Sequence, residues 1–276
     1  MQISYININE IKQAQRFDAE YFKPEFLKIE NKLKKIKWKY CKDIVERKIT
    51  KGETPLWQGF NYLKDGVPFI RSQNIKNLGI LKEDLVFISY NYNKIKQRSI
   101  IKKGDILLAI VGATIGEIGF YDLEVEGNCN QAVAIISAKK DIFKYYLFIL
   151  FKTFYIQKQI SRMQGGNARD NVDLNEVQLI KIPLLSTTFQ SQIENSVKQA
   201  YAKQEQSKKL YKEAEEILLK ELNLLDFTPT QFLTFSTSVK NIQLVGRFDA
   251  EHFQPKYKEI ENKIKNYKGG FDIIKN

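Results

Sequence analysis

The chain has 276 residues, of which 43% are hydrophobic, and it carries a formal net charge of +12 at pH 7. A chain of this size can bury one large core or two small ones. No apolar run approaches the roughly 20 residues that cross a bilayer, and no apolar leader opens the chain. These properties exclude a membrane-spanning protein and predict a globular, cytoplasmic one.

The net charge favours a partner rich in phosphate, such as nucleic acid. However, only seven of the 44 basic residues are arginine, and a lysine-rich composition also arises from coding bias. The charge alone therefore leaves two classes open. One is a DNA-binding protein, and the other is an assembly adaptor that binds no DNA.

Cysteine and histidine are too few for most site chemistry. Cys41 and Cys129 cannot form a disulfide framework, and with His252 as the single histidine they cannot form a Cys/His zinc site. The sequence also contains no phosphate-binding loop and no dinucleotide-binding fingerprint. We therefore expect buried free thiols, no metal, no cofactor and no catalytic residue.

The N-terminal segment, residues 1–37, contains a stretch that returns near the end of the chain. Residues 16–37 align with residues 247–268 at an offset of 231, and thirteen of the 22 positions are identical. In each copy a proline, Pro24 in the first, precedes an amphipathic helical pattern. Because solenoid units span only about 20 to 50 residues, this repeat is predicted to be of domain scale.

Residues 38–185 are predicted to form one β-rich domain. The short runs VPFI, LVFIS, DILLAIV and AVAIIS are separated by turn residues, which indicates a mixed sheet or a partly closed barrel. A helix is expected over residues 141–163, followed by the polar loop 164–173 and a strand over residues 177–185.

Residues 186–226 are predicted to form a long spacer helix. Thr187 and Gln190 resemble a capping box, and a helix over residues 189–225 would be about 55 Å long. Alternating steps of four and three residues define a seam for a partner helix. The seam consists of Ile193, Val197, Ala200, Gln204, Ser207, Tyr211, Ala214, Leu218 and Leu225, with Glu221 at the remaining position.

The remainder of the chain is divided into a linker and an incomplete unit. Residues 227–246 contain a proline and a Ser/Thr cluster, which is typical of a linker. Residues 247–276 form a partial repeat of the N-terminal segment. The sequence therefore predicts one full unit and the opening of another.

Five motifs occur in a characteristic order. Together they resemble the DNA-specificity subunit of type I restriction-modification enzymes. The motifs are KGETP (51–55), GVPFIRSQNI (66–75), KKGDILLAIVGATIG (102–116), NCNQAVAI (128–135) and LIKIPLL (179–185).

This resemblance implies an α+β fold in which a mixed, β-rich target-recognition domain is combined with long helices that form an antiparallel coiled coil. A full subunit of the family carries two such domains, each reading half of a bipartite DNA site. It has no catalytic activity and brings methyltransferase and restriction subunits to double-stranded DNA. Because this sequence contains one recognition domain, we expect a half subunit from a split or truncated gene. Our hypothesis is a homodimer formed through the long helices.

Three polar clusters that interrupt the strand pattern are predicted to contact DNA, because phosphate binding and base reading need basic, amide and hydroxyl side chains. The predicted residues are Lys51 and Thr54; Arg71, Ser72, Gln73 and Asn74; and Asn167, Arg169 and Asn171. The alternative is that Asn74 and Asn171 only form turns and that Arg71 is a surface charge. Asn128 and Gln131 are expected to bind backbone groups instead.

Overall fold

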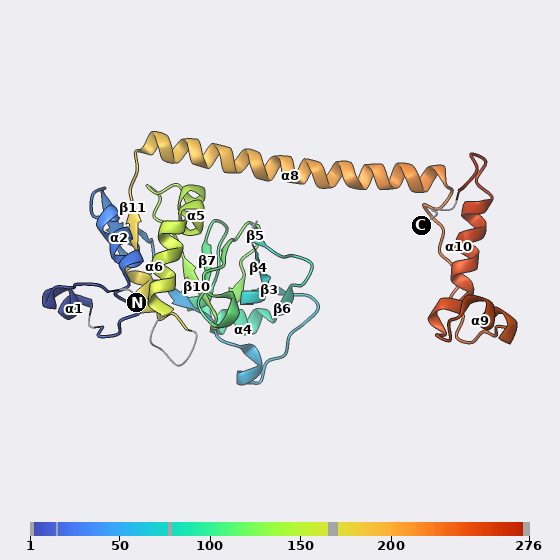
Figure 1. The fold of residues 1–276 in the computed structure, drawn as a ribbon, viewed down its shortest axis with the longest axis horizontal. Coiled ribbons are helices and arrows are strands. Elements are labelled where there is room, and N and C mark those ends of the chain that lie inside the picture. Colours follow the sequence, from blue (N-terminus) through green and yellow to red (C-terminus); the bar gives the residue numbers. More distant parts are fainter. Residues whose placement is uncertain (1–2, 15, 77–78, 165–170, 273–276) are drawn as a thin grey trace. The chain divides into compact units, whose positions relative to one another are not determined.

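The computed structural model describes residues 3–14, 16–76, 79–164 and 171–272. The chain divides into two compact units, residues 1–198 and 199–276. The α-helices, labelled in Figure 1, are α1 (Ile8–Ala14), α2 (Pro24–Leu33), α3 (Cys41–Ile44), α4 (Tyr90–Ile95), α5 (Lys144–Lys152), α6 (Phe154–Gln164), α7 (Leu174–Gln178), α8 (Thr187–Glu221), α9 (Val239–Val245) and α10 (Pro255–Lys265).

Short strands and 3-10 turns make up most of the first unit between α2 and α5. The strands are β1 (Trp38–Tyr40), β2 (Thr50–Lys51), β3 (Val67–Ile70), β4 (Ile75–Lys76), β5 (Gly79–Ile80), β6 (Val86–Ile88), β7 (Ile106–Ala109), β8 (Ile118–Phe120), β9 (Asn128–Cys129), β10 (Val133–Ile136) and β11 (Lys181–Pro183). The 3-10 helices are η1 (Pro55–Gln58), η2 (Ser72–Asn74), η3 (Gln97–Ser99), η4 (Gly112–Thr114) and η5 (Glu251–Phe253).

The central sheet of the first unit has the antiparallel order β2-β10-β7-β8. Side chains alternate between its faces, because successive residues of a strand point in opposite directions. On β7, Ile106 and Leu108 join the core formed with α5 and α6, whereas Leu107 joins a second core on the other face. Burial on both faces explains why this strand has a continuous apolar sequence rather than an alternating one.

The second sheet confirms the expected mixture of strand directions. In the order β6-β3-β9, β3 pairs antiparallel with β6 and parallel with β9. β1 pairs antiparallel with β11, which sets Trp38 opposite Pro183 and joins the beginning of the domain to its end. The α+β class predicted from the sequence is therefore confirmed.

Two expected elements near the end of the domain are different in the structure. The single helix predicted over residues 141–163 is divided into α5 and α6 at Thr153, whose backbone is extended and whose hydroxyl donates to the Leu150 carbonyl at 2.7 Å. The strand predicted from residue 177 begins only at Lys181. The preceding residues form α7, because Asp173 and Glu176 make a reciprocal capping box.

The long helix α8 is present, but its ends differ from the prediction. Its first turn is capped by Ser186, whose hydroxyl accepts a hydrogen bond from the Phe189 amide at 3.3 Å, so the Thr187 capping box is not formed. Asn223 has a φ of 54°, a left-handed conformation that stops a helix. The helix ends at Glu221, and Leu225 therefore lies beyond the helical seam.

The second unit contains no buried residue among those described from 199 to 272. Its helix α9 lies inside the segment expected to be a linker, where the Ser238 hydroxyl caps its start and Gly246, with a φ of 67°, ends it. α10 begins at Pro255, as predicted. Across the described ranges, no helix has both the length and the apolar character needed to cross a membrane.

Candidate nucleic-acid interface

An open groove of about 1080 Å³ lies between residues 47–53 and residues 94–99 of the first unit. Strand β2 supplies one side, at the edge of the central sheet, and the chain around η3 supplies the other. The Thr50 hydroxyl joins the two sides by donating to the carbonyl of Arg98 at 2.8 Å. Two segments that are far apart in sequence therefore form one surface.

Four basic side chains of this groove are exposed and lack an acidic partner within the part of the chain that the structure describes. These unpaired cations are Lys48, Lys51, Lys94 and Arg98. Elsewhere in the chain many lysines are neutralised by nearby carboxylates, such as Lys103 by Glu124. Because the groove concentrates positive charge that no carboxylate offsets, it suits a row of phosphates.

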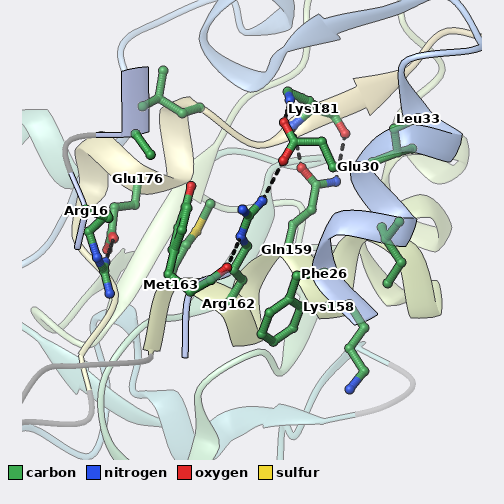
Figure 2. Close-up of a pocket in the computed structure, with 14 residues that line it drawn as sticks. Arg16, Phe26, Glu30, Leu33, Lys158, Gln159, Arg162, Met163, Glu176 and Lys181 are labelled. Atoms are coloured by element: carbon green, nitrogen blue, oxygen red, sulfur yellow. Dashed lines mark hydrogen bonds and ion pairs between the residues drawn. The ribbon is translucent and has the colours of Figure 1, made fainter. Parts of the chain in front are cut away.

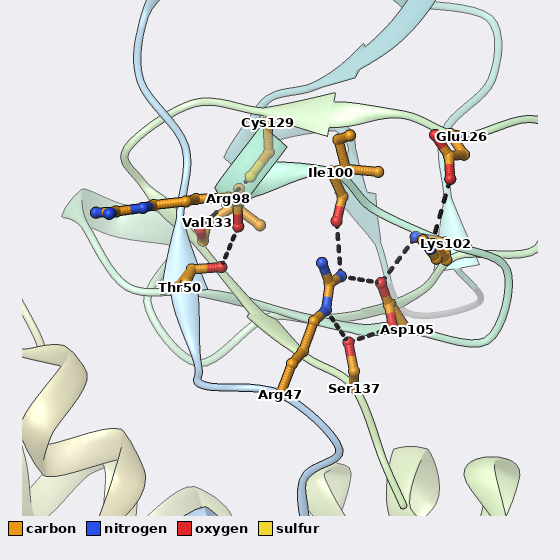
Figure 3. A network of polar contacts seen from close by, with 10 residues as sticks. All are labelled: Arg47, Thr50, Arg98, Ile100, Lys102, Asp105, Glu126, Cys129, Val133 and Ser137. Atoms are coloured by element: carbon orange, nitrogen blue, oxygen red, sulfur yellow. Dashed lines mark hydrogen bonds and ion pairs between the residues drawn. The ribbon is translucent and has the colours of Figure 1, made fainter. Parts of the chain in front are cut away.

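Arg47 also lines the groove, but its guanidinium is used to hold the wall together (Figure 3). Its Nη2 donates to the Oδ2 atom of Asp105 at 2.7 Å and to the Ile100 carbonyl at 2.6 Å. Ser137 donates to the other oxygen of Asp105 at 2.6 Å. Asp105 is only 5% exposed, so it needs these partners. In Figure 3 the side chain of Arg98 points away from this network.

Lys96 has a similar structural role on the opposite side of the groove. Its Nζ atom lies 2.7 Å from Oε2 of Glu53. The hydrogen bond from Lys96 is the main reason why the pKa of Glu53 is lowered from its ordinary value. Arg47 and Lys96 thus position the groove and leave the four unpaired cations for binding.

The first two polar clusters predicted from the sequence meet at the segment Asn130–Ala132. The Gly52 amide donates to the Asn130 carbonyl at 3.2 Å, and the Asn130 amide donates to Ile70, the residue before Arg71, at 3.1 Å. Gly52 is required for this approach, because a Cβ atom there would lie 1.6 Å from the carbonyl oxygen of Cys129. The KGETP motif and the end of β3 are therefore neighbours.

The third cluster is linked to the same segment through the backbone of Ile110. Ile110 donates to the Ala132 carbonyl at 2.9 Å, and Val172 donates to the Ile110 carbonyl at 2.9 Å. Asn171, which precedes Val172, forms a bridge with Val111 and is exposed. Asn167 and Arg169, also predicted to contact DNA, lie outside the described residues.

The side chains within these clusters differ in how accessible they are. Lys51 is exposed and belongs to the groove, and Thr54 donates a hydrogen bond to the side chain of Gln131. Gln131 thus bonds a side chain rather than the backbone group expected for it. Ser72 is half-buried and Gln73 is exposed.

Asp84 holds the second cluster in place. Both Arg71 and Gln73 bind its side chain, at 3.2 Å and 2.9 Å. Asn74 is 0% exposed; its amide nitrogen donates to the Asp84 carbonyl, and its oxygen accepts from the Arg71 amide. Asn74 therefore stabilises the turn, which is the alternative raised from the sequence, and it offers no group to DNA.

Sequence reasoning missed Lys48, Lys94 and Arg98. The stretch NYNKIKQRS does contain three basic residues within five positions. This signal was obscured because lysine is abundant throughout the chain. Asn128, by contrast, behaves as expected of a structural amide, since it is buried and donates to the Lys96 carbonyl at 3.3 Å.

The thiols are buried and unpaired, as expected. Burial raises the pKa of both Cys41 and Cys129 to about 12, so the reactive thiolate is disfavoured. No group of three or more His, Cys, Asp or Glu side chains within the described ranges is arranged to hold a metal ion.

A β-rich domain with an open groove of unpaired cations has the features of a nucleic-acid recognition module. The chain belongs to the family of type I restriction modification DNA specificity domains, whose family model matches residues 34–216. This finding confirms the resemblance seen in the sequence motifs.

Two curated relatives come from Escherichia coli. The specificity subunit of type I restriction enzyme EcoBI is 32% identical over 141 residues, which cover 51% of this chain and 30% of that protein. The EcoKI specificity subunit, from strain K12, is 27% identical over 165 residues, which cover 58% of this chain and 35% of that protein. The match thus spans about a third of the length of these relatives.

Solved structures of related proteins are more distant in sequence. The S subunit of a type I restriction-modification system from M. genitalium has a TM-score of 0.47 and 18% identity, covering 74% of this chain and 49% of that one. The HsdS subunit from Thermoanaerobacter tengcongensis has a TM-score of 0.44 and 18% identity, covering 71% and 48%.

Proposed function

We propose that this protein is the sequence-recognition component of a type I restriction-modification enzyme and that it has no catalytic role itself. The observation that carries this proposal is the groove with its four unpaired cations, beside the polar clusters, in a domain of the specificity family. In this assignment, double-stranded DNA lies along the groove.

Phosphate binding and base reading fall to different residues in this proposal. Lys48, Lys51, Lys94 and Arg98 bind phosphates, because lysine and arginine on an open surface attract the DNA backbone whatever its sequence. Base reading falls to side chains around the segment Asn130–Ala132, which borders the first two clusters and is linked to Asn171 through Ile110.

The residues proposed to read bases are those with accessible donors or acceptors. Arginine and the amides can form two hydrogen bonds with one base edge. Among the described residues we propose Arg71, Gln73 and Asn171 for this role, with Thr54 and Ser72 contributing hydroxyls. Asn167 and Arg169 remain proposed members of the third cluster.

The proposed partners are a methyltransferase subunit and, through it, a restriction subunit. The relatives are named as specificity subunits of type I restriction enzymes, which supports this assignment. We further propose that two copies of the chain associate through α8 and together read a bipartite site. Apolar seam residues such as Tyr211 and Leu218 are 79% and 58% exposed, as expected of a helix that awaits a partner.

The test is selection from a random pool of double-stranded DNA, using the full chain mixed with its methyltransferase subunit at near-physiological salt. Enrichment of two inverted half-sites with a fixed gap is the expected result, because a twofold dimer reads the same sequence twice. A single enriched half-site would support recognition and contradict the dimer. Absence of enrichment, together with absence of duplex binding at low salt, would favour the adaptor.

A further inference from the structure

The N-terminal repeat is docked on the recognition domain through a set of ion pairs (Figure 2). Glu30 of α2 accepts hydrogen bonds from Arg162 of α6, at 2.7 Å, and from Lys181 of β11. Arg16, before α2, donates to Glu176 of α7 at 3.1 Å. We call the surface formed by α6, α7 and β11 at these contacts the docking groove.

Apolar burial and stacking complete this attachment. Phe22, Phe26, Ile29 and Leu33 are all buried. The guanidinium of Arg162 lies 3.9 Å from the centre of the Tyr21 ring. The docking groove therefore fits a segment that combines a buried apolar stripe with charges matched to those of α6, α7 and β11.

The C-terminal repeat carries nearly the same set of side chains at an offset of 231 residues. Arg247 corresponds to Arg16 and Glu261 to Glu30. The buried apolar positions of the first copy correspond to Phe253, Tyr257, Ile260 and Ile264. None of these side chains is buried, and Tyr257 is 40% exposed.

The local structure of the two copies is also the same. The carboxylate of Asp18 accepts hydrogen bonds from Nε of Arg16 at 2.6 Å and from the backbone amide of Tyr21 at 3.0 Å. The carboxylate of Asp249 likewise accepts hydrogen bonds from Nε of Arg247 at 2.8 Å and from the backbone amide of His252 at 3.0 Å. The second copy therefore already has the turn that precedes the helix in the first copy.

Two residue differences between the copies weaken the binding of the second copy to the docking groove. Glu25, which lies 2.9 Å from Lys158 of α6, corresponds to Lys256. Tyr21, which stacks on Arg162, corresponds to His252. In the second copy Lys256 would place a like charge opposite Lys158, and His252 would place a smaller ring on Arg162. The second copy should therefore bind the docking groove more weakly than the first.

We propose that residues 247–265 are a second docking segment for this groove, which binds in trans to α6, α7 and β11 of a second copy of this chain when that copy's N-terminal repeat leaves. The occupant is identified by the internal repeat, because the groove recognises the side chains that both copies share. The inference rests on the proposed self-association only for the identity of the partner.

The test uses two forms of the full chain and a short bismaleimide cross-linker. The first form, the acceptor, carries Lys181→Cys, and the second carries Glu261→Cys. The native thiols do not compete, because both are buried and have pKa values raised to about 12. Each form has one reactive thiol, so the product that joins the two forms reports docking in trans.

A matched control places the cysteine at the neighbouring position, Asn262→Cys, about 100° around the helix. Its counterpart in the first copy, Asn31, is exposed. We expect at least tenfold more cross-linked product from Glu261→Cys than from Asn262→Cys.

Weakening the binding of the acceptor's own N-terminal repeat to the docking groove makes the test more sensitive. Adding Phe26→Ala to the acceptor should increase the specific product several-fold, because its own N-terminal repeat then binds less tightly. Adding Glu30→Gln instead should also increase the specific cross-linked product. This variant keeps the apolar contacts, so the test does not depend on the folding of a single variant. Equal product from the two cysteine positions in all acceptors would overturn the proposal.

Failure of this inference is distinguishable from failure of the proposed function. Sedimentation of the unmodified chain reports association through α8, and DNA selection reports recognition. A dimer that selects DNA but gives no specific cross-link would contradict only trans docking. A specific cross-link within one chain carrying both cysteines, without product between chains, would also overturn it.

Discussion

The two copies of the repeat share thirteen of 22 residues, and their structures are locally alike. The first copy packs its apolar stripe against α6 and the rest of the first unit, whereas none of the corresponding side chains in the second copy is buried. The same amphipathic sequence thus forms the same helix in both surroundings. The repeat therefore encodes an amphipathic helix, and the environment decides whether its apolar face contributes to stability.

The largest difference is expected for the aromatic residue at the centre of the stripe. Phe26→Ala should lower the free energy of unfolding by about 3 kcal/mol, because it removes a buried ring and leaves a cavity. Tyr257→Ala, at the corresponding exposed position, should change it by less than about 0.5 kcal/mol. Urea unfolding followed by tryptophan fluorescence measures both. Equal losses would mean that the second copy is packed in solution.

The basic residues of the two units are also expected to differ in their contribution to DNA binding. Replacing Lys48, Lys51, Lys94 and Arg98 together by alanine should weaken duplex binding about a hundredfold near 0.1 M salt, as about four phosphate contacts are lost. The slope of log K against log salt should fall in magnitude by about 0.9 for each contact. Fluorescence anisotropy with a labelled duplex measures both quantities.

The control removes the same charge from α10, with Lys256, Lys258, Lys263 and Lys265 replaced by alanine. Because these lysines lie outside the groove, the loss of affinity should be less than about threefold. Similar losses for the two variants would mean that binding follows net charge and that the groove has no special role.

A smaller difference is expected for the half-buried carboxylate of Glu30. Burial alone would raise the pKa of Glu30, but hydrogen bonds from Lys181 and Arg162 outweigh it and lower the pKa from 4.5 to about 2. Glu30→Gln should therefore cost about 2 kcal/mol at pH 7, since it leaves two cations without their partner. Glu261→Gln should cost almost nothing.

This effect has a defined pH window. Because the folded-state pKa is depressed, the stabilisation by Glu30 is complete above about pH 4.5 and is lost as the pH falls toward about 2. The difference in unfolding free energy between the wild type and Glu30→Gln should shrink over this interval. Urea unfolding at a series of pH values measures it, and a constant difference would show that the ion pairs do not set the pKa.

The smallest difference is expected at the position where the copies have opposite charge. Glu25→Lys should destabilise the protein by less than about 1 kcal/mol, because its contact with Lys158 at 2.9 Å is partly exposed. Lys256→Glu, which reverses one partner of the exposed ion pair with Glu251 at 2.7 Å, should have an effect that is no larger. High salt should remove the effect of Glu25→Lys, and an effect that persists in 1 M salt would indicate lost packing instead.

Much of the fold was predictable because it depends on local periodicity. The runs VPFI and DILLAIV became β3 and β7, and Pro24 begins α2 as expected. The predictions that were wrong concern features that depend on single residues. Thr153 divides the predicted helix through its hydroxyl, and Asn223 ends α8 early through a left-handed backbone.

The candidate site was predictable only in part. The sequence indicated clusters of polar residues, and it included Lys51, which the structure places in the groove. It could not separate Asn74, which is buried, from Gln73, which is exposed. Nor could it find Arg98, because nothing local distinguishes a free cation from one that a distant carboxylate neutralises.

The sequence by itself determined the α+β class, the family and the presence of a repeated helix, because apolar spacing and motif order are properties of neighbouring residues. Only the tertiary structure decided which copy of the repeat is buried and which cations remain unpaired. Burial and charge neutralisation are contacts between residues such as Glu30 and Lys181, which lie 151 positions apart. Such contacts exist only after the chain has folded.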